Sequence, residues 1–211
     1  MHIFLQGPKN IGKSTVIRKT LDILSAEAHV KIGGFFTWNG GRGDPHVYIQ
    51  KAALFRPQTV PMPPAHYDPQ TDPMPPAHCA PQTAPMPPAH VSGVERFCIA
   101  DYDERLGRLV SHPDAFEQHG VRFLRDNSAA GLIIMDELGF LESGANEFMR
   151  AVIDTVLGTI PVFGVLRLGD VPWHDEIKKN PLVRLVDVNE QNRDILPREL
   201  AAELVKLFSI T

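Results

Sequence analysis

A glycine-rich segment near the start of the chain limits the possible folds more than any other feature. Residues 7–14 read Gly-Pro-Lys-Asn-Ile-Gly-Lys-Ser and match the pattern G-x-x-x-x-G-K-[ST] without a gap. The apolar run His2 to Gln6 stops at Gly7 and is typical of a buried strand. Ser14 to Ala28 follows with apolar residues along one helical face. The segment therefore joins a strand directly to a helix, which is the arrangement that a phosphate-binding loop requires.

The residue types in this segment each suit the binding of phosphate. Glycine at positions 7 and 12 lets the backbone turn and approach phosphate oxygens closely, and successive N–H groups then form an anion nest. The N-terminus of the following helix adds a positive dipole end. Lys13 supplies a mobile positive charge to the β- and γ-phosphates, and the Ser14 hydroxyl is a hard oxygen ligand for Mg²⁺. We expect the nucleotide to be bound by Gly7, Pro8, Lys9, Asn10, Ile11, Gly12, Lys13, Ser14 and Thr15.

An acidic pair in the second half of the chain completes the expected site. Residues 132–135 form a continuous apolar run, typical of a parallel strand covered on both faces, and Asp136 and Glu137 follow it directly. A phosphate loop needs an acidic metal ligand at the end of another buried strand, so we expect Ser14 and Asp136 to hold Mg²⁺. Glu137 can orient and activate the attacking water, which makes Lys13 and Glu137 the expected catalytic residues. The alternative interpretation of Glu137 is a capping or salt-bridging residue.

Strands alternate with helices along the rest of the chain. The apolar patterns predict further strands at residues 29–37, 46–50, 96–100, 160–166 and 183–188, and further helices at 113–127, at 145–157 and from 197 onward. Residues 39–43 read Asn-Gly-Gly-Arg-Gly, a strong turn signal before the strand at 46–50. This alternation predicts an α/β fold with a mostly parallel sheet, in which ligands bind at the carboxyl ends of the strands.

A proline-rich tandem repeat interrupts this pattern. Twelve of the 19 prolines lie between residues 56 and 91, in three copies of about 12 residues. Proline removes backbone donors and forbids both helix and central strand, so we expect a disordered insertion at 56–91 within a single domain, 1–211. His66, His78 and His90 recur at the repeat period. We interpret the repeat as a solvated surface loop; the alternatives are weak metal ligation or a docking ligand for a protein partner.

Composition excludes several other classes of protein. The net charge of −4 and the pI near 6.1 argue against a strongly basic nucleic-acid binder. No apolar run approaches the roughly 18–20 residues of a membrane span, and the N-terminus lacks the features of a signal peptide. Cys79 and Cys98 give neither a disulfide framework nor a zinc-site spacing. We therefore expect a cytoplasmic protein that does not bind membranes.

Three further segments carry a family resemblance. Residues 34–37 (GFFT), 136–142 (DELGFLE) and 192–194 (NRD) are similar to the patterns G-F-[YF]-T, D-E-[IL]-G-x-[ML]-E and N-R-D, in this order. Together with residues 7–14 they resemble the THEP1-like nucleoside-triphosphatases, which are small P-loop NTPases of the RecA (ASCE) type. The resemblance covers most of the chain outside the repeat. Two segments depart from the family pattern, because residues 38–42 (WNGGR) replace a charged stretch and Phe140 stands where a lysine is common.

The resemblance implies both a fold and an activity. The fold would be a three-layer P-loop NTPase fold with a RecA-like sheet. The activity would be Mg²⁺-dependent hydrolysis of several nucleoside triphosphates, ATP and GTP among them, to diphosphate and phosphate. Carried over residue by residue, it implies that Lys13 and Ser14 contact phosphate and metal, that Asp136 holds the metal and that Glu137 is the base.

Two other functions and one further residue role stay open at this point. A small-molecule kinase acting on a nucleoside or nucleotide would use the same loop with an acceptor pocket. A nucleotide-gated binding module would bind nucleotide with little turnover. A transition-state cation is often needed in phosphoryl transfer, and Arg42 and Arg193 are candidates because each lies in a loop after a strand. A surface arginine is the alternative interpretation of either one.

Overall fold

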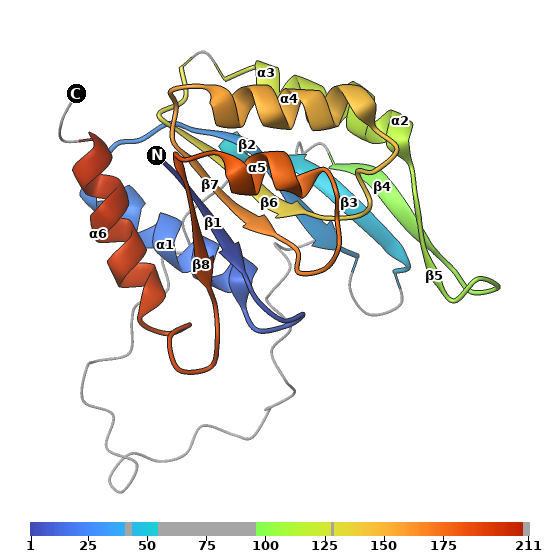
Figure 1. The fold of residues 1–211 in the computed structure, drawn as a ribbon, viewed down its shortest axis with the longest axis horizontal. Coiled ribbons are helices and arrows are strands. Elements are labelled where there is room, and N and C mark those ends of the chain that lie inside the picture. The colour runs from blue at the N-terminus through green and yellow to red at the C-terminus, as the bar shows by residue number, and fades with distance from the viewer. Residues whose placement is uncertain (41–43, 55–95, 128, 209–211) are drawn as a thin grey trace, which may run out of the picture.

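The computed structural model describes residues 1–40, 44–54, 96–127 and 129–208. Within these ranges, eight strands form one sheet in the order β5-β4-β3-β2-β6-β7-β1-β8 (Figure 1). Their bounds are β1 His2–Gln6, β2 Ile32–Asn39, β3 His46–Lys51, β4 Arg96–Asp103, β5 Arg108–Ser111, β6 Leu132–Leu138, β7 Val162–Leu166 and β8 Val183–Asp187.

The sheet has a parallel and an antiparallel part. Strands β2, β6, β7, β1 and β8 pair in parallel, whereas β3, β4 and β5 extend the sheet beyond β2 by antiparallel pairing. In the parallel part all carboxyl ends meet at one edge, so the loop after β1 and the ends of β6 and β7 lie together.

Helices cover both faces of the parallel strands (Figure 1). Helices α1 and α6 pack together on one face, while α2 to α5 with the π-helical segment η2 lie on the other. Residues of β1 alternate accordingly, since Ile3 and Leu5 join the α1/α6 core and Phe4 joins the opposite one. The bounds are α1 Lys13–Glu27, η1 Ala52–Leu54, α2 Pro113–Ala115, η2 Phe116–Gly120, α3 Val121–Arg125, α4 Asn146–Leu157, α5 His174–Lys179 and α6 Leu196–Phe208.

The structure confirms the expected α/β fold with helices on both faces of the sheet, and it corrects several element boundaries. The helix expected at 113–127 is three short segments, α2, η2 and α3. Strand β6 continues through Asp136 to Leu138, because Asp136 pairs with Phe36 of β2 and Leu138 pairs with Leu166 of β7. Strand β5 and helix α5 were not expected from sequence, because β5 has only four residues and α5 has only six, five of them polar.

Some expectations lie outside the described residues. The repeat at 56–91 and Arg42 both fall there, so the interpretation of 1–211 as one domain with an insertion stays a prediction. Across the residues that are described, no helix is long and apolar enough to cross a membrane.

A buried histidine on α5 makes the fold sensitive to acid. His174 is fully buried, and neither ring nitrogen has a hydrogen-bond partner among the described residues. Burial, together with the nearby charge of Lys178, lowers the pKa of His174 to about 4. Below pH 6.5 the unfolded chain takes up a proton here while the folded chain does not, so the folded state loses stability as the pH falls from 6.5 toward 4.

We therefore expect His174→Leu to stabilise the fold. An unpaired buried polar group costs about 1–3 kcal/mol, so the free energy of unfolding should rise by about 1 kcal/mol at pH 7 and by more at pH 5. Urea denaturation at the two pH values measures both. The control is His29→Leu, at an exposed position, which should keep the wild-type pH dependence. If the free energy of unfolding of His174→Leu depends on pH as in the wild type, His174 is not the source of the acid sensitivity.

Candidate nucleotide site

The loop after β1 has the backbone shape that close phosphate approach requires. The backbone φ angle is 151° at Gly7, 64° at Asn10 and 108° at Gly12. Residues that carry a Cβ atom rarely adopt such positive φ angles, whereas glycine adopts them readily. A Cβ atom on Gly7 would lie 2.6 Å from the carbonyl oxygen of Val188, so this position has room only for glycine. Gly12 then leads directly into α1, whose first turn faces the loop.

Lys13 lies inside the loop rather than in solvent. Its side chain is buried, and Nζ donates hydrogen bonds to the carbonyl oxygens of Gly7 at 2.9 Å and Pro8 at 3.0 Å. Burial lowers the pKa of Lys13, while the carboxyl groups of Glu137 and Asp136 act in the opposite direction. The ammonium group is thus held at the loop, facing the acidic pair.

Asp136 is a buried carboxylate, and one of its two oxygens has no hydrogen-bond partner among the described residues. It is 1% exposed; Oδ1 accepts a hydrogen bond from Ser14 Oγ at 3.0 Å, and Oδ2 has no partner within the described part of the chain. Burial, reinforced by neighbouring Glu137, raises the pKa of Asp136 to about 7. A free buried carboxylate oxygen beside a hydroxyl oxygen is a hard donor set that fits Mg²⁺.

Glu137 is held by two neighbouring strands. Its backbone N–H donates to Thr37 Oγ1 on β2 at 3.1 Å, and its side chain is about a third exposed. Arg167, directly after β7, places Nη1 3.7 Å from Glu137 Oε1. The Arg167 guanidinium also lies 4.6 Å from the centre of the Phe140 ring, and its backbone N–H donates to Leu138 at 2.9 Å. The carboxylate therefore faces the loop edge, with a cation beside it.

These four side chains, Lys13, Ser14, Asp136 and Glu137, form a polar edge at the carboxyl ends of β1 and β6. The NTPase family model matches residues 92–201, more than half of the 211 residues, including Asp136 and Glu137. The chain belongs to the THEP1-like nucleoside-triphosphatase family. Membership confirms the expected enzyme class, a hydrolase of nucleoside triphosphates.

Similar proteins match this chain over nearly its whole length. The Nucleoside-triphosphatase THEP1 of Thermofilum pendens is 26% identical, over 99% of this chain and 97% of its own. A Bos taurus protein named Cancer-related nucleoside-triphosphatase homolog is 26% identical over 96% of each chain. The crystal structure of THEP1 from Aquifex aeolicus superposes with a TM-score of 0.65 at 18% identity, covering 97% of this chain and 99% of that one. This likeness confirms the P-loop NTPase fold.

Of the two arginines predicted for this THEP1-like site, one can be placed. Arg193 is exposed and lines a cavity of about 520 Å³ beside the loop, with Pro8 to Ile11 and residues 189–191. No described contact joins it to Glu137. Arg167, which was not predicted, makes that contact. The sequence did contain a signal for Arg167. This charged residue follows the apolar run 160–166 directly, just as Asp136 follows the apolar run 132–135.

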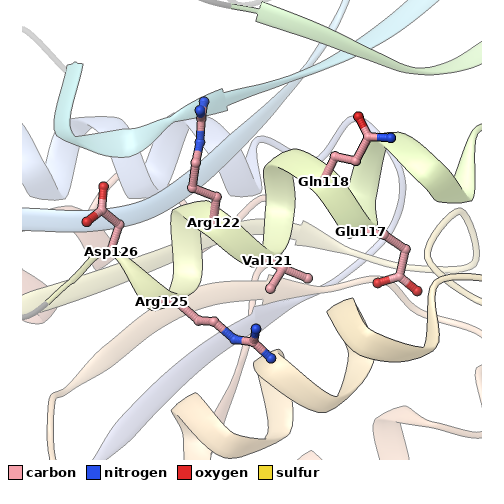
Figure 2. A pocket seen from close by; sticks show the side chains of 6 residues that line it. All are labelled: Glu117, Gln118, Val121, Arg122, Arg125 and Asp126. Carbon is pink, nitrogen blue, oxygen red and sulfur yellow. The ribbon is translucent and has the colours of Figure 1, made fainter.

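A second hollow, of about 400 Å³, lies on η2 and α3 (Figure 2). Its lining is Glu117, Gln118, Val121, Arg122, Arg125 and Asp126. Figure 2 shows Arg122 and Arg125 pointing in opposite directions from the helix. Glu117 accepts hydrogen bonds from the first N–H groups of α4, and Asp126 pairs with Lys51 at 2.8 Å. These contacts join η2 to α4 and the end of α3 to β3, and none of the predicted site residues lies here.

Proposed function

We propose that this chain hydrolyses nucleoside triphosphates to diphosphate and phosphate in a Mg²⁺-dependent reaction with little selectivity for the base. The observation that carries the proposal is the meeting of Lys13, Ser14, Asp136 and Glu137 at one edge of the sheet. Family membership establishes the hydrolysis of nucleoside triphosphates. The proposals that the reaction needs Mg²⁺ and that the enzyme accepts several bases rest on this geometry and on the resemblance.

The metal and the loop have separate tasks in this proposal. Ser14 and Asp136 would hold Mg²⁺, because their oxygens adjoin and one carboxylate oxygen is unpaired. When bound, the ion would supply positive charge to the β- and γ-phosphates. Lys13 would transfer its hydrogen bonds from the loop carbonyls to phosphate oxygens, and the loop N–H groups would stabilise the charge of the transferred phosphoryl group.

Glu137 is the proposed base. Its side chain is partly exposed at the loop edge, where it can accept a proton from a water aligned with the γ-phosphate. In the resting site the Arg167 guanidinium lies beside this carboxylate, with Nη1 3.7 Å from Oε1. As phosphoryl oxygens gain charge, the same guanidinium can turn to them, which makes Arg167 our candidate for the transition-state cation.

Trp38 lies at the end of β2, where its indole ring could stack on a base. The Arg18 guanidinium lies over one face of this ring, 3.9 Å from its centre, so a base cannot stack on that face. We therefore assign no base selection to this face of Trp38, in keeping with the proposed activity on several bases.

Phosphate release with Mg²⁺ across ATP, GTP, CTP and UTP tests the proposed function. We expect comparable turnover of all four and none after chelation. Turnover of one base only would contradict breadth, and full turnover without a divalent ion would contradict the role of Ser14 and Asp136. Transfer of phosphate to a nucleoside or nucleotide acceptor instead of water would favour the kinase, and tight binding with negligible release would favour the binding module.

Arg167→Ala should lower kcat by about 10²–10³-fold, the effect of removing one stabilising donor at a transition state. KM should change less, because the contact forms as charge develops. The matched control is Arg150→Ala, an exposed arginine on α4, and it should keep wild-type kinetics. Arg42→Ala and Arg193→Ala remove the two arginines that were predicted from sequence, and their kcat values are compared with that of Arg167→Ala. A large loss in either of these, with Arg167→Ala unaffected, would show that the cation is wrongly assigned.

A further inference from the structure

A second cluster of side chains able to bind a metal lies on the antiparallel part of the sheet. His46 begins β3, while Cys98 and Asp101 belong to β4, the next strand along. None of the three is among the residues that the nucleotide site uses. The ligand atoms of these three residues all lie within 4.8 Å of one another.

An extra residue in β4 brings these side chains to one face. Val47 pairs with Ala100 and Tyr48 with Cys98, which leaves Ile99 as the extra residue of a β-bulge. In a regular strand, residues three apart point to opposite faces. The bulge instead turns Cys98 and Asp101 to the same side, where His46 lies opposite Asp101. Bulges of this kind re-aim side chains and are frequent next to functional sites.

The contacts within the cluster converge on one carboxylate oxygen. His46 Nδ1 is hydrogen-bonded to Asp101 Oδ1, and Cys98 Sγ donates to the same oxygen at 3.3 Å. The three residues are each partly exposed, so an ion can reach them from solvent. A nitrogen, a sulfur and an oxygen around one point are ligands that Zn²⁺ accepts together.

Two further side chains support these ligands from behind. His112 Nε2 is 2.7 Å from Asp101 Oδ2, whereas the contacts of Cys98 and His46 go to Oδ1. Asp44 Oδ1 lies 3.9 Å from His46 Nε2 and accepts a hydrogen bond from the His46 backbone N–H at 3.0 Å. Metal-binding histidines commonly have a carboxylate at the second ring nitrogen, and ligating carboxylates are themselves hydrogen-bonded.

A cysteine nucleophile is the main alternative for this cluster. Cys98 Sγ donates to Asp101 Oδ1 at 3.3 Å and to the carbonyl oxygen of Ala100 at 3.5 Å. Two acceptors around a thiol do not favour the thiolate that a nucleophile needs. Bound to a metal, the Cys98 thiolate and the Asp101 carboxylate would carry two negative charges, which match one divalent cation.

We propose that His46 Nδ1, Cys98 Sγ and the Asp101 carboxylate form a Zn²⁺ site, with His112 and Asp44 as positioning residues. Three protein ligands leave one tetrahedral position for water or a further ligand. The ion would join β3 to β4 and, through His112, to the segment after β5. The site is separate from the Mg²⁺ and nucleotide site, and it does not depend on the proposed function.

Zn²⁺ titration of the chelator-treated full chain by calorimetry tests this site. We expect one strong site in the wild type. Cys98→Ser and His46→Ala should each weaken it by about 100-fold or more, and His112→Ala by about 10–100-fold. Co²⁺ as a second probe should give a thiolate-to-metal absorption band that Cys98→Ser abolishes. Phosphate release by each variant, which should match the wild type, reports that it is folded.

Two control variants distinguish this cluster from the repeat, which contains Cys79 and three histidines. Cys79→Ser, and the triple replacement of His66, His78 and His90 by Ala, should retain Zn²⁺ affinity and the Co²⁺ band. The proposal is overturned if the wild type shows no strong site. It is equally overturned if the site survives both Cys98→Ser and His46→Ala, or if the repeat variants abolish it.

Discussion

Glu137→Gln should lower kcat by about 10²–10⁴-fold, the usual contribution of a general base. The amide keeps the size of the side chain but cannot accept the proton of the attacking water. Nucleotide affinity should stay the same or increase, because the charge of Glu137 raises the pKa of adjacent Asp136. Removing that charge favours the ionised Asp136 that holds a cation. Single-turnover phosphate release measures the hydrolytic step, and calorimetry with Mg²⁺ and a nucleotide measures binding.

The matched control for this variant is Glu147→Gln. Glu147 is exposed on α4, where it pairs with Arg150 at 3.5 Å, and it has no contact with the loop among the described interactions. It should keep wild-type turnover. If Glu137→Gln also turns over at the wild-type rate, Glu137 is not the base, and the capping interpretation made from sequence would stand.

Lys13→Ala should abolish both measurable binding and turnover, with a loss in kcat/KM of at least about 10²–10³-fold. The side chain is buried against the loop carbonyls and interacts electrostatically with Asp136 and Glu137, so its removal takes the ammonium group away from the phosphate loop. Triphosphate would then meet two carboxyl groups and no compensating ammonium. Nucleotide calorimetry and phosphate release in parallel measure the two losses.

Lys19→Ala is the control for this prediction. Lys19 lies on the exposed side of α1, where its ammonium is 4.0 Å from Asp194. It changes the net charge of the chain by the same amount without touching the loop. Wild-type activity in Lys13→Ala would overturn the whole assignment of the nucleotide site, whereas equal losses in both variants would indicate an effect of charge alone.

Residues adjacent in sequence explain most of what could be predicted about the site. The loop from Gly7 to Ser14 forms from one contiguous segment, and its local geometry decides its chemistry. Asp136 could be predicted as its partner because a phosphate loop needs an acidic metal ligand at the end of another buried strand. The details differ, since β6 extends past Asp136, and pairing of Leu138 with Leu166 of β7 rather than local pattern decides where the strand ends.

The amino-acid sequence alone determined the fold class, the phosphate loop and the acidic pair, because each depends on a local pattern of glycine, charge or apolar residues. Only the tertiary structure decided which distant side chains meet. Strand order places Arg167 beside Glu137 instead of Arg193. Antiparallel pairing brings His46 to Asp101, 55 residues further along the chain, and a single bulge adds Cys98. No spacing in the sequence encodes these contacts, since strand register and sheet order arise from packing of the whole domain.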